Sequence, residues 1–247
     1  MDSDAGTALS VRLAPDLWLF VVPRRRREQI EVRYDGDATL GHVVEALGVP
    51  LTEVGTLRSS GATVTASYRP HPGDTIEVRS LQRPQQVPGW SGQFLLDVHL
   101  GTLARRLRIL GIDAAYRNDA DDDALVDEAA DQRRVLLTQD RGLLKRRALW
   151  AGAYVRGAQP GEQLADVLNR FAPTLVPWTR CTTCNGEVDA VAKHEVSDRL
   201  PAGTRRRYDH FTRCRRCGRV YWHGAHSRRL DAIVAAARSD RGRPAPT

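Results

Sequence analysis

The stretch FLLDVHLGTLARRLRILGIDAAY, residues 94–116, decides the class of the fold. It opens with a short apolar strand, Phe94–Leu96. Apolar side chains then recur at helical spacing, at Leu100, Leu103, Ala104, Leu107 and Leu110. Gly111 suits the backbone conformation that ends a helix, and the next apolar triplet, Ala114–Tyr116, is a second strand. This order predicts two parallel strands joined by a crossover helix.

The same alternation of strands and helices continues to residue 172. The further predicted elements are a helix around 125–133, a strand Val135–Thr138, a helix Leu143–Leu149, a strand Ala153–Val155 and a helix Glu162–Phe171. Residues 92–172 are therefore expected to form an α/β domain, in which helices flank a parallel sheet.

A different pattern precedes this domain, in residues 8–81. The predicted elements are a hairpin of Ser10–Val22 and Gln29–Tyr34, a helix Leu40–Leu47, and strands Val64–Tyr68 and Thr75–Val78. This order resembles the β-grasp fold of ubiquitin and of small sulfur-carrier proteins. Those carriers end in a free Gly-Gly, whereas this chain continues through a Pro/Gln/Gly-rich linker at 82–93. The resemblance therefore favours docking, to a protein partner or to RNA, over conjugation.

Acidic residues follow the predicted parallel strands where each strand ends. Asp97 follows the first strand and Asp140 the third. A further acidic cluster lies between a strand and a helix, at Asp119, Asp121, Asp122 and Asp123. Ligands of open parallel sheets bind beyond the carboxyl ends of the strands, and clustered carboxylates suit Mg²⁺ or Mn²⁺. The pattern predicts a divalent ion held by Asp97, Asp122 and Asp140, at which water could attack a phosphodiester.

Helix capping is the alternative for these residues, because Asp is favoured at helix N-termini. One residue of the 121–123 cluster would then cap only the helix that follows, and Asp140 would cap the next one. His99 is a candidate metal ligand or acid, although a half-exposed loop residue is the simpler interpretation.

All cysteines of the chain lie in two pairs with a two-residue spacing: Cys181, Cys184, Cys214 and Cys217. This spacing lets both thiolates of a turn reach one tetrahedral ion. The pattern predicts a zinc ribbon at residues 178–226, with an inserted hairpin at 187–211 between the pairs. Four thiolates close the zinc shell, so this ion is expected to be structural.

The net charge of +7 is concentrated at the C-terminal end, since residues 173–247 hold 15 basic and 7 acidic residues. Such a region attracts polyanions, of which nucleic acid is the commonest; solubility is the alternative. The candidate RNA contacts are Arg105, Arg108, Arg215, Arg216, Arg219 and Trp222. For the arginines of the helix at 100–110 a solvated face remains an alternative, and for Trp222 simple packing does.

The stretches quoted above, together with DDDALVDEAADQRRVLLTQDRGLLKRR and CRRCGRVYWHGAH, resemble the RNase family named after the C-terminal part of the Mut-seven exonuclease. The resemblance covers nearly the whole chain. It implies a PIN-like RNase domain between an N-terminal ubiquitin-like domain and a C-terminal zinc ribbon. It also implies RNA cleavage with Mg²⁺ or Mn²⁺, and its acidic positions fall on Asp97, Asp122 and Asp140.

The resemblance assigns two further positions. Thr138 matches the Ser or Thr that PIN domains favour two residues before an acidic residue, where it orients the loop. A fourth acidic residue has no clear counterpart, and Asp119 and Asp121 are both candidates, which leaves one or two catalytic ions open.

These features together predict a cytoplasmic, metal-dependent ribonuclease that holds single-stranded or structured RNA on a basic zinc ribbon. The apolar runs are too short to cross a bilayer, and the N-terminus shows no secretion signal. Two alternatives keep the same domains: a non-catalytic RNA-binding adaptor, and a toxin-like nuclease restrained by its N-terminal domain. The tail at 238–247 is expected to be disordered.

Overall fold

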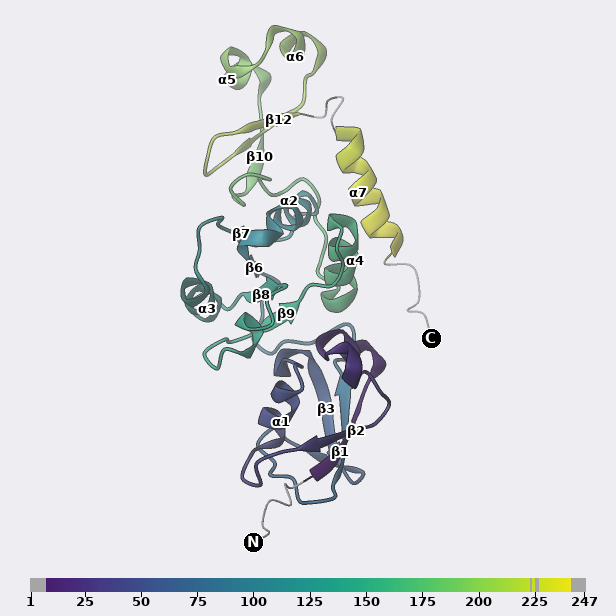
Figure 1. The fold of residues 1–247 in the computed structure, drawn as a ribbon. Helices are drawn as coiled ribbons and strands as arrows, with labels where there is room; N and C mark the ends of the chain where they lie inside the picture. The colour runs from purple at the N-terminus through teal and green to yellow at the C-terminus, as the bar shows by residue number, and fades with distance from the viewer. Residues whose placement is uncertain (1–7, 223, 225–226, 241–247) are drawn as a thin grey trace.

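The computed structural model describes residues 8–222, Gly224 and residues 227–240, and it consists of three modules in a row (Figure 1). The N-terminal module lies at one end, a central module carries a parallel sheet, and a small cysteine-bearing sheet lies at the other end. The C-terminal helix runs back alongside the central module. Within the described ranges, no helix is both long and apolar enough to cross a membrane.

The N-terminal module is a five-stranded mixed sheet with one helix packed across it. Its strand order is β2-β1-β5-β3-β4, with bounds β1 Ala8–Leu13, β2 Ile30–Arg33, β3 Val54–Ser59, β4 Ala62–Val64 and β5 Thr75–Ser80. The predicted helix is α1, Leu40–Ala46, which begins after Thr39 because the Thr39 hydroxyl accepts the N–H of His42. Its apolar face packs into the core of this β-grasp module.

The expected strand Ser10–Val22 is a strand only as far as Leu13. Pro15 then begins a 3-10 helix, Pro15–Phe20, because proline lacks the N–H that a strand would use and is pre-set for the first turn of a helix. This short helix buries Leu17 and Phe20. The apolar run was therefore evidence of burial and not of strand pairing.

Strand β3 was missed, and the strand expected at Val64–Tyr68 was placed too late, since β4 ends at Val64. The pairing of β3 with β5 shifts register between Val54 and Leu57. Inward side chains of β3 consequently do not alternate regularly, and the period-two pattern that reveals a strand is lost.

The central module is the predicted α/β domain. Its strands are all parallel in the order β7-β6-β8-β9, with bounds β6 Phe94–Leu96, β7 Ala114–Tyr116, β8 Val135–Thr138 and β9 Gly152–Tyr154. Helices α2, Gly101–Ile109, and α4, Pro160–Phe171, cover one face, and α3, Asp122–Asp131, covers the other. Leu96 packs with α2 and α4 while its neighbour Leu95 packs with α3, because successive strand side chains point to opposite faces.

One helix of the central module is much shorter than expected. The segment Leu143–Leu149 contains only a 3-10 turn, Leu143–Lys145, and the backbone is extended again at Arg146. The turn still buries Leu143 and Leu144. The apolar spacing thus predicted burial correctly and helix length wrongly.

The C-terminal sheet is antiparallel, in the order β10-β11-β12, with bounds β10 Val188–Val191, β11 Phe211–Cys214 and β12 Val220–Trp222. The expected inserted hairpin is present as β10 and β11, but its tip is helical. The tip consists of α5 Lys193–Val196, a 3-10 turn Ser197–Arg199 and α6 Ala202–Arg207. Val196 and Leu200 pack on Phe211 to hold it. Helices this short carry no periodic pattern, so the sequence did not reveal them.

A further helix, α7, spans Ser227–Asp240 and was not predicted. Its Val234 and Ala237 are buried in the core of the central module beside α2 and α4. The expectation of a disordered tail at 238–247 is wrong for 238–240, which are helical, and residues 241–247 lie outside the described residues. Of the expected ribbon at 178–226, residues 223, 225 and 226 also lie outside them.

Candidate active site and metal centre

The carboxyl ends of β6 and β8 meet at one edge of the central sheet. Leu96 lies opposite Leu137 in the parallel register, so Asp97 and Thr138 are the next residues of two neighbouring strands. After β6 the chain passes to α2 on one face, whereas after β8 it passes to the turn at Leu143 on the other. Neighbouring parallel strands whose connections leave in opposite directions open a crevice in which ligands bind. The strands that precede Asp97 and Asp140 are therefore neighbours, as expected.

Thr138 links the two acidic residues. Its hydroxyl donates to Asp97 Oδ2 at 2.6 Å and accepts the N–H of Asp140 at 2.8 Å. Thr138 is fully buried and Asp97 is only 7% exposed, whereas Asp140 is exposed. Asp140 Oδ1 accepts the N–H groups of Gly142 and Leu143, so this oxygen shapes the turn. Asp97 Oδ1 and Asp140 Oδ2 accept no hydrogen bond from the residues that the structure describes.

The third acidic loop lies at the start of α3. Asp121 caps this helix, because its Oδ1 accepts the N–H of Ala124 at 2.8 Å. Asp123 forms an ion pair with Arg146. The capping alternative therefore applies to Asp121, whereas the exposed Asp119 and Asp122, the first residue of α3, have no hydrogen bond or ion pair from their side chains to a described residue.

These carboxylates are not gathered at one point. Among the described residues, no three acidic side chains bring their oxygens within 4.8 Å of one another. Thr138 joins the Asp97 carboxylate to the backbone of Asp140, and Asp122 does not complete a cluster with these two residues. His99 is exposed on the turn that follows Asp97.

The four cysteines, in contrast, converge. Their Sγ atoms lie within 4.8 Å of one another, with 3.7 Å between Cys181 and Cys217 and 3.4 Å between Cys184 and Cys214. Four sulfurs at about 2.3 Å from a tetrahedral zinc ion are about 3.8 Å apart. None of the four is in a disulfide. The cluster could therefore bind a zinc ion, and the predicted ligand set is brought together.

Hydrogen bonds favour the thiolate form of Cys181. The Tyr221 hydroxyl lies 2.9 Å from Cys181 Sγ, and the N–H of Cys184 donates to the same sulfur. Burial by itself raises the pKa of Cys181, but these hydrogen bonds lower it to about 6. On the other pair, the N–H groups of Arg216 and Cys217 point at Cys214 Sγ. Both turns thus direct donors at sulfur, as metal-binding thiolates require.

Polar contacts tie the cysteine-bearing module to the central one. Arg108, expected to contact RNA, is only 4% exposed and donates to the carbonyl oxygens of Ala114, Thr182 and Thr183. Arg108 therefore joins α2 to the first cysteine turn, because its Nε and Nη1 groups are used by carbonyl oxygens, and this weakens it as a candidate RNA contact.

Asp113 is the second tie between these modules. Its carboxylate accepts from Asn185, beside the first cysteine pair, and from Arg134, and it pairs with Arg180. Burial alone raises the pKa of Asp113, but the hydrogen bonds from Arg134 and Asn185 hold it below its usual value.

The remaining candidate RNA contacts differ in how far their charge is compensated. Arg215 forms ion pairs with Glu187 and Asp189. Arg105, Arg216 and Arg219 are exposed and have no ion pair with any described residue. Trp222 is 36% exposed and does not belong to the small core of its module. The packing alternative for Trp222 is therefore disfavoured, and Arg215 is the weakest remaining candidate.

The junction between the N-terminal and central modules was not predicted. Glu53 and Arg170 form an ion pair in which both side chains are only 2% exposed, and Glu53 Oε1 also accepts the N–H of Tyr154. Burial raises the pKa of Glu53 and lowers that of Arg170, each against the attraction of the other. The one sequence signal for this junction was a charged residue, Arg170, inside an apolar segment. Its partner Glu53 lies 117 positions away, so the sequence did not reveal the pair.

The same junction reaches the candidate site. Arg141, next to Asp140, donates to the carbonyl oxygens of Leu19 and Phe20 and lies over the Phe20 ring. Lys145 donates to the carbonyl oxygen of Glu45. The loop that carries Asp140 is therefore held by the N-terminal module.

A family model described as the Mut7-C RNAse domain matches residues 92–234, more than half of the chain. The chain belongs to this family. A second model, described as Mut7-C ubiquitin, matches residues 6–86, which agrees with the β-grasp module of this Mut7-C protein. Membership supports a nuclease or otherwise RNA-related function for the Mut7-C domain.

Two solved structures are similar to part of this Mut7-C chain. The small archaeal modifier protein 1 of H. volcanii is 19% identical, with 30% of this chain and 98% of that chain covered and a TM-score of 0.25. A structure described as SAMP1 from Haloferax volcanii is 21% identical, with 33% and 98% covered and a TM-score of 0.24. No curated protein matches the sequence.

Proposed function

We propose that the Mut7-C domain of this chain is a metal-dependent ribonuclease that hydrolyses RNA phosphodiester bonds at the edge shared by β6 and β8. The Thr138 hydroxyl carries this proposal, because it joins the Asp97 carboxylate to the backbone N–H of Asp140. A buried carboxylate is costly unless hydrogen bonds or a cation compensate its charge. The buried carboxylate of Asp97 lies at the crevice of a parallel sheet, where ligands bind. Membership of an RNase family supports the same reading.

In this proposal Asp97, Asp122 and Asp140 hold Mg²⁺ or Mn²⁺. Carboxylate oxygens are the ligands these ions prefer, and Asp97 Oδ1 and Asp140 Oδ2 are not used by the described residues. The ion, when bound, polarises the phosphate and makes water a better nucleophile. Thr138 is a positioning residue, because one hydroxyl orients Asp97 and the turn of Asp140 together.

The other modules have supporting roles in this proposal. A structural zinc ion, bound by the four cysteines, holds the ribbon, and the exposed Arg216, Arg219 and Trp222 contact RNA together with Arg105 of α2. Cysteines that stay reduced for a metal fit a cytoplasmic location. The N-terminal module serves as a docking unit.

A second candidate is a non-catalytic RNA-binding adaptor. It is favoured by one observation, that the oxygens of the three carboxylates do not lie within 4.8 Å of one another. A nuclease restrained by its N-terminal module is a third, favoured by the contacts that Arg141 makes with that module.

Cleavage of labelled single-stranded RNA, with Mn²⁺, with Mg²⁺ and without divalent ions, tests the proposal. We expect Asp97→Asn and Asp140→Asn each to lower the rate by roughly 100-fold or more, since each removes charge at the reacting centre. Asp131→Asn, at the far end of α3, is the matched control and should keep the wild-type rate. Rates near wild type for both variants, in preparations free of other nucleases, would support the adaptor instead.

A further inference from the structure

A groove of about 650 Å³ lies along the ribbon sheet. Its lining is mostly apolar and aromatic, with arginines among it: Trp178, Phe211, Tyr221, Trp222, Arg180 and Arg219. Flat aromatic surfaces beside guanidinium groups are the combination that binds unpaired bases and their phosphates.

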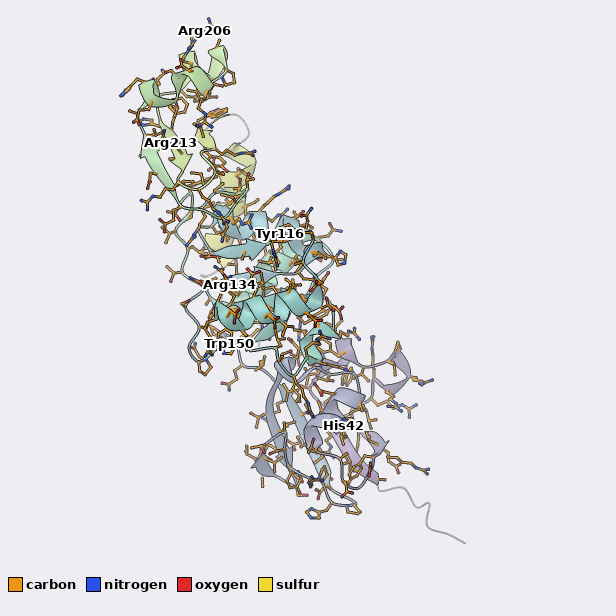
Figure 2. The ribbon with its side chains drawn as sticks, turned by 90° about the vertical axis from the view of Figure 1, so that its left-hand side faces the viewer. His42, Tyr116, Arg134, Trp150, Arg206 and Arg213 are labelled. Atoms are coloured by element: carbon orange, nitrogen blue, oxygen red, sulfur yellow. The ribbon has the colours of Figure 1, made fainter. Side chains whose placement is uncertain are left out.

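A second hollow, of about 500 Å³, lies between α2 and the first cysteine turn. Gly101 and Tyr116 of the central module form one wall, and Thr182 and Arg219 form the other. Figure 2 shows Tyr116 in the part of the central module nearest the ribbon. Thr182 and Arg219 line both the groove and this hollow, so the two are adjacent and share a wall.

The hollow ends beside the acidic edge of the sheet. Gly101 is separated from Asp97 only by the 3-10 turn Val98–Leu100. The Tyr116 hydroxyl donates to the carbonyl oxygen of Val98 at 2.9 Å. A Cβ atom at Gly101 would lie 2.7 Å from the Tyr116 hydroxyl, so only glycine allows this close approach. The groove and the hollow thus share two lining residues, and the hollow reaches Gly101, which directly follows the turn after Asp97.

The arginines of the ribbon differ in how far their charge is compensated. Arg213 pairs with Glu195, and Arg215 pairs with Glu187 and Asp189. Arg105 and Arg219, which line the hollow from α2 and from the ribbon, have no ion pair with any described residue. Uncompensated positive charge therefore lies on both sides of the hollow, whereas Arg180 of the groove pairs with Asp113, and Arg216 outside it also has no ion pair with a described residue.

We propose that the groove and the hollow form one binding track for single-stranded RNA. Bases stack in the groove at Trp222, and the backbone passes between Arg219 and Arg105 toward Asp97. A single strand is the occupant because its bases are open to stacking, whereas in a duplex they are hidden in the helix. The direction of the track rests on the proposed nuclease site, but the binding does not require cleavage.

Binding is measured with a fluorescein-labelled RNA oligonucleotide and full-length protein that carries Asp97→Asn, without divalent ions and without chelator. We expect the pair Arg105→Ala and Arg219→Ala to weaken binding about 10-fold or more and to lower the slope of log affinity against log salt by about 1.4, at about 0.7 for each lost phosphate contact. The pair Arg33→Ala and Arg79→Ala removes the same charge from the exposed surface of the N-terminal module and should change neither value.

Stacking is tested at the ribbon end of the track. Trp222→Ala should weaken binding by roughly 5- to 150-fold, the range for loss of one stacked base, and Trp222→Phe should restore most of it. Because Trp222 is outside the ribbon core, both variants should fold, as zinc content can verify.

Equal effects of the test and control arginine pairs, or equal affinity for duplex and single-stranded RNA, would overturn the track. So would a Trp222→Ala variant whose RNA binding is unchanged but whose oligomeric state differs from that of the wild type. The last would assign the groove to a second copy of the chain. The binding and cleavage experiments test the RNA track and the nuclease site independently. If Asp97→Asn protein cleaved RNA at the full rate while the arginine and Trp222 variants still bound RNA weakly, the proposed catalytic site would be rejected and the RNA track would stand.

Discussion

The two junctions of the central module are built in opposite ways. Toward the N-terminal module, water is excluded around the Glu53–Arg170 pair. Toward the ribbon, the contacts from Arg108 and Asp113 leave a hollow of about 500 Å³ beside them. A closed junction fixes its neighbour, whereas an open one leaves room for a ligand.

The difference suggests a division of labour around the candidate site. The closed junction holds the loop of Asp140 through Arg141, so the N-terminal module acts as part of the scaffold. The open junction lies beside the turn that follows Asp97, where a substrate can enter. The following predictions test this contrast, from the largest expected effect to the smallest.

Loss of zinc should produce the largest difference in stability between the two junctions. We expect about one zinc ion per chain and expect Cys217→Ser to unfold the ribbon, since apparent zinc binding energies of small domains are about 10–16 kcal/mol. Hydrogen exchange should then rise in the ribbon and remain slow around Glu53. Metal analysis checks the first point, and stoichiometric zinc retained by Cys217→Ser would contradict the ligand assignment.

Breaking the buried pair should damage the closed junction. Glu53→Leu alone or Arg170→Leu alone should each lower the free energy of unfolding by about 3–5 kcal/mol, because one buried charge loses its partner. The double variant should recover part of this loss. Arg215→Ala, which breaks exposed ion pairs, is the control and should change the free energy of unfolding little. Urea unfolding measures all four proteins, and additive single losses would argue against direct coupling.

Arg141→Ala should loosen the loop of Asp140 from the N-terminal module. The loss of hydrogen bonds from a charged donor should cost about 1.5–3 kcal/mol and should lower kcat more than it raises KM. Arg147→Ala, exposed after the same turn, is the matched control. A rise in the cleavage rate of the Arg141 variant would instead show that the N-terminal module restrains the nuclease.

Acid should weaken the open junction through Asp113. Its folded pKa lies below the unfolded value, so its contribution to stability is fully present above the unfolded pKa, about 3.9, and is lost as pH falls through the folded value. The Tm should therefore fall below about pH 4, and Asp113→Asn should show a smaller fall in that range. Equal pH profiles for both proteins would show that Asp113 does not carry this dependence.

Much of the fold and of the candidate site followed from local patterns. Apolar spacing located every strand of the central sheet and placed Asp97 and Asp140 just after two of them, and the structure makes these two strands neighbours, with β7 at the edge. The cysteine spacing identified the four-cysteine cluster, which could bind a metal ion. These inferences succeeded because burial periodicity and ligand spacing are properties of short segments.

Long-range partners were decided only by the tertiary structure. Arg105 and Arg108 lie on one short helix and line the same hollow, yet Arg108 is buried and donates to carbonyl oxygens of the ribbon while Arg105 is exposed. Glu53 and Arg170 are 117 positions apart. A sequence states which side chains carry charge, but whether a charge is paired, buried or left open depends on which distant segment packs beside it. For this chain, the sequence determined the modules and their candidate ligand residues, and packing between modules decided which arginines are buried or paired and which remain exposed.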